Sequence, residues 1–415
     1  YQLTNKLKKF LGSYMLYLLT FLFCFTCPLL ASNKAATSKF IMVHYMPWYA
    51  SKSISGQWGA HWTMNHFDPD KLDAKGKQEL ASHYRPLIGA YDSNDPALLE
   101  CQVLLMKFSG INGVIIDWYG TKDFRDYAVL HRNSLSLIKY IKKAGLNFAI
   151  CYEDQTVKHM INGGVLKKSQ ELAYAEKEFL WMEKNFFADP AYKRVNEKPI
   201  LLIFGPQHFK KDQWTHIISA LSIKPHLFTL PHLNHEINNS GEFGWPPVYG
   251  GKNISPKEWK KYLQDLYEGG GNSSTIASVF PQFHDIYQQA GAHKSYGYLD
   301  SQKGKTFDQT LQMALKSNSK LIQIATWNDY GEGTMIEPTT EFAYEYLEKL
   351  QSLFKENKKF SFNSSDLRLP VNLYQLRKHY EGNKEINADL NVASKLLFDS
   401  KTNEAKKILK RYSQN

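Results

Sequence analysis

The feature that most constrains the fold is an alternation of short apolar runs with longer runs of helical spacing. Eight apolar runs predict β-strands, and they span residues 40–46, 113–119, 147–153, 199–204, 225–230, 245–249, 275–280 and 320–325. Helical spacing occurs at 96–109, 127–144, 168–187, 256–267 and 341–354. Eight β–α repeats predict an α/β protein, a (β/α)8 TIM barrel with extended strand-to-helix loops. Of the eight runs, 245–249 is the weakest.

The N-terminal segment does not fit this repeat. Residues 1–31 predict a secretory signal peptide, because three lysines precede an apolar run at 11–30 and small residues follow it. An uncleaved membrane anchor is the alternative, since the run approaches the length of a membrane span. Lipidation at Cys27 is a less favoured outcome. We therefore expect a secreted or periplasmic protein, or one anchored at the cell surface.

The C-terminal segment also changes character. We assign residues 32–362 to the barrel and residues 363–415 to an extension. The extension begins with a connector at 366–370 that we expect to be extended. Its helical runs lie at 373–380, 388–398 and 403–412. The pattern predicts a small helical tail packed on the barrel, with a separate interaction module as the alternative.

Charge and cysteine content exclude several classes of protein. The formal net charge of +11 falls to +8 without the three lysines of the signal segment, and no arginine-rich stripe or nucleic-acid motif accompanies it. Cys101 and Cys151 are expected to be buried free thiols. The sequence has no zinc-binding spacing, no serine-hydrolase elbow and no phosphate-binding loop, so no metal and no cofactor is expected. The oligomeric state is not encoded in any pattern.

A loop after the last predicted strand carries the strongest chemical signal. The run from Ile324 to Pro338 reads I-A-T-W-N-D-Y-G-E-G-T-M-I-E-P, with Asp329 and Glu332 three residues apart and a glycine on each side of Glu332. Cleavage of a glycosidic bond needs one carboxyl to protonate the leaving oxygen and another to act as base or nucleophile. A solvated acidic loop is the alternative, but the aromatic and glycine context favours a catalytic site. We predict that Asp329 and Glu332 are catalytic.

Other strand ends supply aromatic and polar side chains that could bind a sugar. The carboxyl ends of barrel strands meet at one mouth, and pyranose faces stack on aromatic rings. The chain has 14% aromatic residues, which suits such a site, although cores use aromatic residues too. The predicted substrate-binding residues are Tyr45, Trp48, Tyr49, Trp58, His61, Trp62, Asp117, Trp118, Glu153, His284, Trp327, Asn328 and Tyr330. Alternatives are a hydrophobic lid for the first loop and structural hydrogen bonds for Asp117 and His284.

These motifs resemble glycoside hydrolase families 99 and 71. Family 99, the endo-acting α-mannosidases and α-mannanases, is similar at N-E-W-H-E-G-T-x-I-E, and the chain matches it at Asn328, Glu332 and the G-T-x-I-E tail. The chain also matches the family's P-W-Y at 47–49, its H-W at 61–62, and a strand-end glutamate at Glu153. Family 71, the α-1,3-glucanases, is similar at W-N-D-Y-G-E, which is present letter for letter. The resemblance implies the same barrel and a secreted α-glycosidase.

The resemblance also implies a mechanism. Family 99 hydrolysis proceeds with retention, through deprotonation of the sugar 2-hydroxyl by one carboxylate while another serves as general acid and then base. Carried over by position, Glu332 is the acid/base residue and Asp329 acts on the 2-hydroxyl. Family 99 has glutamate at 329 and histidine at 331, whereas aspartate and glycine here follow family 71. We therefore expect endo action on α-mannan or a related α-glycan, with α-1,3-glucanase activity or a catalytically inactive carbohydrate-binding protein as alternatives.

Overall fold

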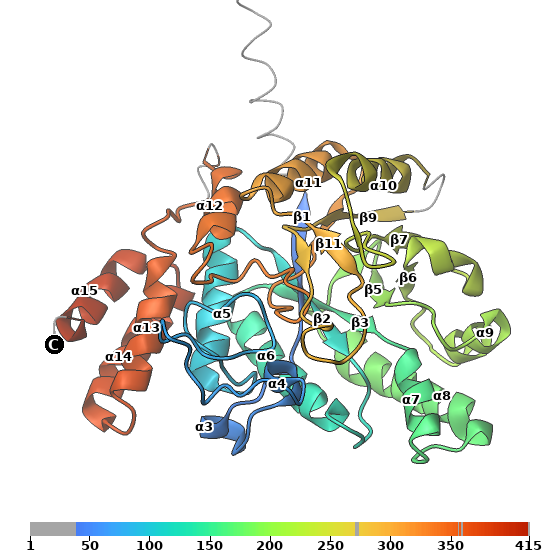
Figure 1. Ribbon diagram of the computed structural model, residues 1–415, viewed down its shortest axis with the longest axis horizontal. Coiled ribbons are helices and arrows are strands. Elements are labelled where there is room, and N and C mark those ends of the chain that lie inside the picture. The colour runs from blue at the N-terminus through green and yellow to red at the C-terminus, as the bar shows by residue number, and fades with distance from the viewer. Residues whose placement is uncertain (1–38, 270–273, 356, 358–359, 414–415) are drawn as a thin grey trace, which may run out of the picture.

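The computed structural model describes residues 39–269, 274–355, 357 and 360–413. The predicted signal peptide and its two cysteines lie outside the described residues. Within these ranges, none of the helices combines the length and the apolarity that crossing a membrane requires. Figure 1 shows strands at the centre of the molecule and helices around them.

The described chain folds as a closed barrel of parallel strands. Neighbouring strands pair in chain order, and the last also pairs with the first, which closes the sheet. The strands of the barrel are β1 (Phe40–Tyr45), β2 (Gly113–Trp118), β3 (Asn147–Tyr152), β5 (Lys198–Ile203), β6 (His226–Thr229), β7 (Gly241–Phe243), β9 (Ser274–Val279) and β12 (Leu321–Ile324). All six residues of β2 are buried, as expected for a strand covered on both faces. The predicted (β/α)8 barrel is confirmed.

Helices and short elements fill the connections between the strands. The main helices are α5 (Pro96–Ser109), α6 (Tyr127–Lys143), α7 (Gln155–Asn162), α8 (Glu171–Met182), α9 (Lys211–Ser219), α10 (Pro256–Gly269), α11 (Lys305–Lys316) and α12 (Glu345–Ser352). Smaller elements are α3 (Lys52–Ser55), α4 (Ala60–Thr63), the single turns Lys168–Gln170, Glu183–Phe187 and Pro231–Glu236, and the strands β4 (Arg194–Val195), β8 (Lys252–Asn253), β10 (Phe283–His284) and β11 (Gly297–Leu299). The strands β8, β10 and β11 form a small sheet beside the barrel mouth.

Both ends of helix α5 were predicted correctly because each carries a local sequence signal. Asp95 caps the helix by accepting a hydrogen bond from Ala97 N, and Pro96 occupies the first helical position. Gly110 ends the helix in a left-handed conformation with φ of 87°. Each signal is a local property of the sequence, so prediction and structure agree at both ends.

Two predicted elements are wrong. The sixth strand is β7, and residues 245–249 form the loop that follows it. Pro246 and Pro247 lie in that run and cannot donate hydrogen bonds to a sheet, whereas β7 is too short to give a pattern. The connector at 366–370 is also not extended, because the chain turns and enters a helix at Arg368. Pro370 is tolerated there, since it falls in the first helical turn.

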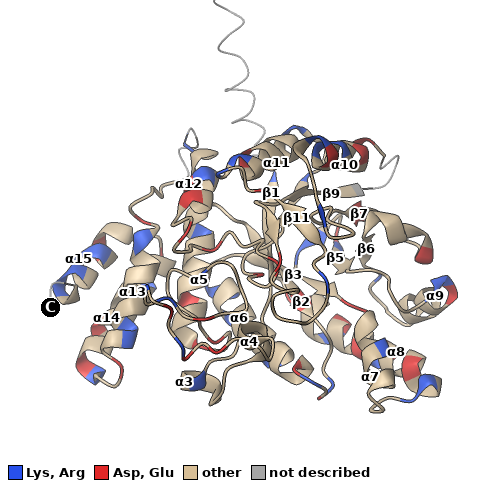
Figure 2. Cartoon of the chain, viewed as in Figure 1, with Lys and Arg blue, Asp and Glu red and all other residues tan. Residues whose placement is uncertain are grey.

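The C-terminal segment forms three helices, α13 (Arg368–His379), α14 (Lys384–Phe398) and α15 (Thr402–Tyr412). They lie beside α5, at the orange and red end of the chain in Figure 1. Arg377 of α13 donates to both carboxylate oxygens of Glu100 in α5, over 2.6 and 3.2 Å. Figure 2 shows basic and acidic residues interspersed on α14 and α15, so the excess of lysine forms no uniform basic stripe in this view.

Candidate active site

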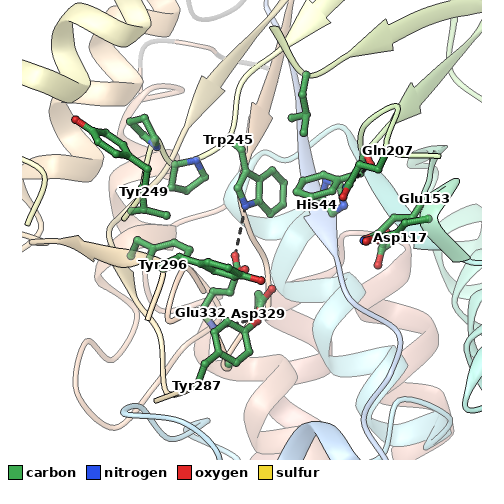
Figure 3. A pocket seen from close by; sticks show the side chains of 18 of the residues that line it. His44, Asp117, Glu153, Gln207, Trp245, Tyr249, Tyr287, Tyr296, Asp329 and Glu332 are labelled. Carbon is green, nitrogen blue, oxygen red and sulfur yellow. Dashed lines mark hydrogen bonds between the residues drawn. The ribbon is translucent and has the colours of Figure 1, made fainter. Parts of the chain in front are cut away.

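A deep cleft opens at the carboxyl ends of the barrel strands. Its volume is about 1910 Å³, and residues that follow β1, β2, β3, β5, β6, β7, β9 and β12 line it. Figure 3 shows Asp329 and Glu332 on one side and Asp117 with Glu153 on the other, with Trp245 and His44 between them. The cleft therefore brings carboxyl groups from three strand ends to one floor.

The loop after β12 positions the two predicted catalytic carboxyls. Asp329 is only 3% exposed, and its Oδ1 accepts a hydrogen bond of 3.0 Å from Glu332 N. Asp329 N donates to Thr326 Oγ1 over 2.8 Å. The carboxylate of Asp329 thus shapes the turn that presents Glu332, whose side chain lines the cleft.

A polar clamp fixes this loop to β1. The side chain of Asn328 accepts from Met46 N over 2.8 Å and donates to Met46 O over 3.0 Å. The hydroxyl of Tyr49 donates to Asn328 O and accepts from Tyr330 N. These bonds hold the backbone on both sides of Asp329, so the first and last strands of the barrel share one rigid edge.

Gly333 is required by the turn that follows Glu332. Its φ is 67°, and a Cβ at this position would lie 2.7 Å from His284 O. Because a side chain would meet backbone, only glycine fits this close approach. The turn joins the catalytic loop to the loop after β9, where His284 N donates to Glu332 O over 2.8 Å.

Trp245 is the direct neighbour of Glu332 from the opposite side of the cleft. Its Nε1 donates to Glu332 Oε2 over 3.3 Å, the dashed line in Figure 3. The indole lies edge-on to the rings of His44 and Phe204, each with its centroid 5.0 Å away. Glu332 is therefore held between an aromatic wall and the turn set by Asp329.

The two carboxyls of this loop hold protons with different affinity. Burial raises the pKa of Asp329 to about 6, and the hydrogen bond from Glu332 N opposes the rise. Burial raises the pKa of Glu332 well above its usual value, and the negative charge of Asp329 adds to the effect. Burial thus favours the protonated form of both carboxyls, and the charge of Asp329 favours it further in Glu332, which suits Glu332 as the acid of an acid/base pair.

Asp117 and Glu153 form a second buried pair. Burial raises the pKa of Glu153 to about 7, and the charges of Asp154 and Asp329 contribute. Burial also raises the pKa of Asp117 well above its usual value, with the charge of Glu153 adding. Burial thus favours the protonated form of both groups, and a carboxyl in either form can hydrogen-bond a sugar hydroxyl.

Comparisons with known proteins show what the chain is similar to. Residues 36–225 match the model of glycosyl hydrolase family 99. The chain is 22% identical over 369 residues to a human glycoprotein endo-α-1,2-mannosidase-like protein, covering 75% of this chain and 72% of the relative. It is also 22% identical over 339 residues to rat glycoprotein endo-α-1,2-mannosidase, covering 72% and 67%.

Solved structures agree with the sequence match. A family 99 endo-α-mannosidase from Bacteroides thetaiotaomicron, in complex with bis-tris propane, superposes with a TM-score of 0.58 at 18% identity. The alignment covers 77% of this chain and 98% of that one. The chain is a glycoside hydrolase, and it is similar to proteins of family 99. The additional likeness of its catalytic loop to family 71 stays a prediction.

The structure brings about half of the predicted site residues of this glycoside hydrolase into the cleft. Those that line it are Trp48, Tyr49, His61, Asp117, Glu153, Asp329 and Glu332. Trp48 and His61 stack in parallel with ring centroids 4.1 Å apart, and His61 pairs with Asp126 over 3.0 Å. The first loop therefore offers one flat aromatic surface to the cleft.

The other predicted residues do not line the cleft. They are Tyr45, Trp58, Trp62, Trp118, His284, Trp327, Asn328 and Tyr330. Most of them make structural hydrogen bonds: Tyr45 to Gln102, Trp62 to Tyr91 O, Trp118 to His131, Trp58 to Asp70, and Tyr330 to Glu337. His284 stacks on His83, and its Nδ1 lies within hydrogen-bond distance, 3.2 Å, of the Tyr84 hydroxyl. Most aromatic residues of the motifs thus support the loops, whereas Trp48 and Tyr49 line the cleft.

Several cleft residues were not predicted. They are His44, Trp245, Tyr249, Tyr287 and Tyr296. The sixth strand was predicted to begin at Trp245. This residue was therefore not considered among those that follow a strand and line the cleft. Tyr249 and Tyr296 are 53% and 48% exposed, and only the fold shows that their rings face the cleft.

Proposed function

We propose that the protein is an endo-acting, retaining α-mannosidase or α-mannanase, with Glu332 as general acid/base and Asp329 as its partner carboxylate. The observation that carries the proposal is the buried pair on one loop: Asp329 Oδ1 accepts a hydrogen bond from Glu332 N over 3.0 Å, and both side chains line the cleft. The names of its relatives, which are endo-α-1,2-mannosidases and similar proteins, supply the substrate class.

The charge states of the two groups fit each half of the reaction. Asp329 accepts the proton of the 2-hydroxyl, the 2-oxygen attacks the anomeric carbon, and Glu332 gives its proton to the leaving oxygen. In the second half, Glu332 takes a proton from the attacking water and Asp329 returns its proton to the 2-oxygen. No protein nucleophile is needed. The 2-oxygen attacks the anomeric carbon opposite the leaving group, and water then attacks opposite the 2-oxygen, so two inversions retain the configuration.

The size of the cleft supports endo action. Ordinary small-molecule pockets measure about 300–1,000 Å³, so a cleft of about 1910 Å³ has room for several sugar rings. Aromatic side chains line it from Trp48 in the first loop to Tyr249 and Tyr296 beyond Glu332. We also propose a secreted or periplasmic location, on the ground of the signal-like segment 1–31.

A second candidate is α-1,3-glucanase activity. Position 331, which is histidine in family 99, is glycine here, and a Cβ at Gly331 would lie 3.0 Å from Met64 Cε. A histidine at position 331 would therefore require Met64 to move. The cleft floor beside Gly331 thus differs in shape from one that carries the family 99 histidine. The loop W-N-D-Y-G-E follows the α-1,3-glucanases at the same place.

A substrate panel tests both candidates. The panel contains an α-mannan, an α-1,2-linked mannoside and an α-1,3-glucan, and the wild type is assayed beside Glu332→Gln. We expect cleavage of a mannoside that Glu332→Gln abolishes, with an α-configured product seen first by NMR. Cleavage of the glucan alone would select the second candidate, and an inverted product would exclude the retaining mechanism.

A further inference from the structure

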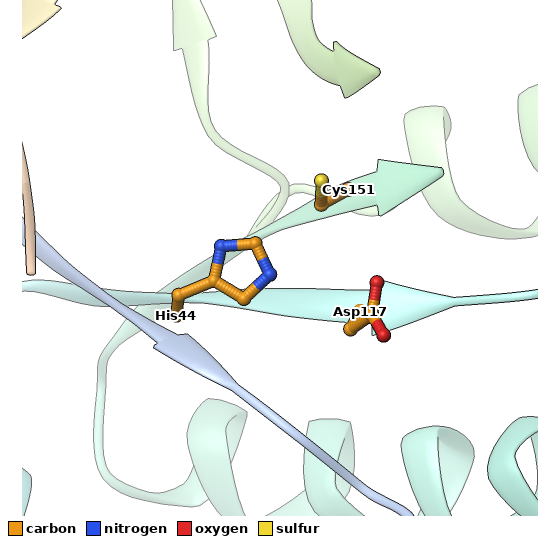
Figure 4. Close-up of side chains that lie close together, drawn as sticks. All are labelled: His44, Asp117 and Cys151. Atoms are coloured by element: carbon orange, nitrogen blue, oxygen red, sulfur yellow. The ribbon is translucent and has the colours of Figure 1, made fainter. Parts of the chain in front are cut away.

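Three side chains with different ligand atoms meet on the inner face of the barrel, beneath the cleft. Asp117 of β2 pairs in register with Cys151 of β3, so their side chains emerge on the same face. His44 of β1 pairs with Ile115, which lies two residues before Asp117 and shares its face. The register of three neighbouring strands therefore brings an imidazole, a carboxylate and a thiol together (Figure 4).

The three groups are close, buried and incompletely satisfied. One ligand atom from each lies within 4.8 Å of the other two. Their exposed fractions are 1% for His44, 2% for Asp117 and 0% for Cys151. Asp117 Oδ2 is buried without a hydrogen-bond partner, and the bond between His44 Nδ1 and Gln323 Oε1 is long at 3.4 Å. An unpartnered carboxylate oxygen inside a barrel costs free energy that a ligand would recover.

We propose that His44, Asp117 and Cys151 form a binding site for a soft divalent cation of the Zn²⁺ type. Imidazole, carboxylate and thiolate are the ligand set that Zn²⁺ accepts, whereas Mg²⁺ and Ca²⁺ take oxygen ligands. Ligand bonds of about 2.0–2.3 Å place the atoms of a tetrahedral site about 3.5 Å apart, so the side chains close by about 1 Å on binding. Binding releases the thiol proton to solvent.

The fourth coordination position faces the substrate. His44 and Asp117 both line the cleft, whereas Cys151 lies behind them. An ion held by three protein ligands keeps one position for water or a sugar hydroxyl. Occupation would withdraw Asp117 from the sugar, and it would fix His44 against Trp245, the donor to Glu332. The site is therefore inhibitory: a cation bound there lowers glycoside hydrolysis.

The binding test uses Co²⁺ as a spectroscopic probe on the full chain, freed of metal by chelation. A bound cysteine gives a thiolate-to-Co²⁺ charge-transfer band in the near ultraviolet. The matched variants are Cys151→Ser and Cys101→Ser, because Cys101 is a second buried free thiol away from the site. We expect the band in the wild type and in Cys101→Ser, its loss in Cys151→Ser, and its displacement by Zn²⁺. A band of equal strength in Cys151→Ser, or none in the wild type, would overturn the site.

The activity test separates this site from the proposed substrate. Hydrolysis of whichever panel glycan is cleaved is measured with and without ZnCl2. Cys151→Ser is expected to keep the metal-free rate and to require at least about tenfold more Zn²⁺ for half inhibition, equal to 1.4 kcal/mol. Equal sensitivity in the two proteins would overturn the inhibitory role. If Cys151→Ser fails to fold by circular dichroism, His44→Gln replaces it in the Co²⁺ titration, where a retained band again counts against the site.

Discussion

At the scale of single residues, the site depends on unequal environments for two carboxyls that are three residues apart. The backbone N–H of Glu332 stabilises the anion of Asp329, and nothing equivalent reaches Glu332 except the long bond from Trp245. Burial acts on both groups, but the charge of Asp329 falls on Glu332 and raises its pKa further. One short turn therefore gives two similar side chains different environments, as the proposed base and acid require.

The pH profile of kcat/KM tests this assignment. Activity needs Asp329 ionised, so the rate should rise with pH through about 6, and it needs Glu332 protonated, so the rate should fall on the alkaline side. Asp329→Asn is expected to lose about 10²–10⁴-fold in kcat, the usual range for a lost general base. Asp329→Glu, which restores the family 99 side chain, should keep more activity. An unchanged acidic limb in Asp329→Glu and substantial activity in Asp329→Asn would contradict the role of Asp329.

Trp245→Phe tests the second environment. The change keeps an aromatic ring against His44 but removes the hydrogen-bond donor to Glu332. In the wild type, the hydrogen bond from Trp245 lowers the pKa of the Glu332 carboxyl. The pKa of Glu332 should therefore rise, and the alkaline limb of the pH profile should move upward by up to about one unit, given about 1.5 kcal/mol for a hydrogen bond to a charged group. Trp214→Phe is the control, because Trp214 lies in α9 and does not line the cleft. A limb that stays in place would show that the 3.3 Å contact does not act on catalysis.

The sequence pointed to Asp329 and Glu332, which line the cleft, but it did not show which strand-end neighbours face the cleft. Tyr45 and Trp118 were predicted to bind substrate, yet both point toward the helices, and His44 and Asp117 point inward. Adjacent side chains in a strand alternate between faces, so a prediction that is off by one residue selects the wrong face. A strand buried on both faces gives no polar alternation to resolve this choice.

At the scale of elements, a buried glutamate connects the catalytic loop to helix α5. Glu337 accepts hydrogen bonds from Tyr91, Tyr330 and Gln102, and it is 3% exposed. Burial raises its pKa to about 7, although all three hydrogen bonds oppose the rise. The tail of the family motif therefore ends in a structural residue that anchors the loop from behind.

Glu337 should make stability depend on pH. Its pKa in the folded protein, about 7, exceeds the usual 4.5, so the folded state holds a proton that the unfolded chain lacks between these values. The stabilisation is complete below about 4.5 and is lost as pH rises through about 7. Glu337→Gln removes this titration. The free energy of unfolding of the variant, relative to that of the wild type, should therefore increase by on the order of 3 kcal/mol between pH 4.5 and 7.5. Denaturant unfolding at both pH values measures this difference, and Glu268→Gln, at an exposed position, is the control. A difference in unfolding free energy between variant and wild type that is the same at both pH values would contradict the prediction.

Elements were predictable where their signals are local. The ends of α5 follow from Asp95, Pro96 and Gly110, and the long apolar runs of β2 and β3 were recognised. Strand β7 was missed because its three residues gain their strand geometry from β6 and β9, not from their own sequence. Helices α9 and α11 were also not predicted, and their existence follows from the need to cover the barrel between predicted strands.

At the scale of the whole molecule, the C-terminal helices and the barrel share a buried ion pair. Glu100 in α5 is 4% exposed, and Arg377 meets it with two hydrogen bonds while Ser394 of α14 adds a third. A carboxylate buried this deeply is stable only with its partner in place. The pair therefore couples the extension to the barrel, and without the extension Glu100 would lose both its cation and the hydrogen bond from Ser394.

Arg377→Met tests whether extension and barrel unfold together. The variant keeps the length of the side chain but leaves Glu100 without a cation, so unfolding should become easier by about 3–5 kcal/mol. Glu100→Gln with Arg377→Met should recover most of this loss, because no charge then remains buried. Thermal unfolding of both variants should show a single transition that moves as a whole, since α13 packs directly on α5. A second transition at lower temperature, with the main one unmoved, would mean that the helices unfold as an independent module and that the ion pair stabilises only their attachment.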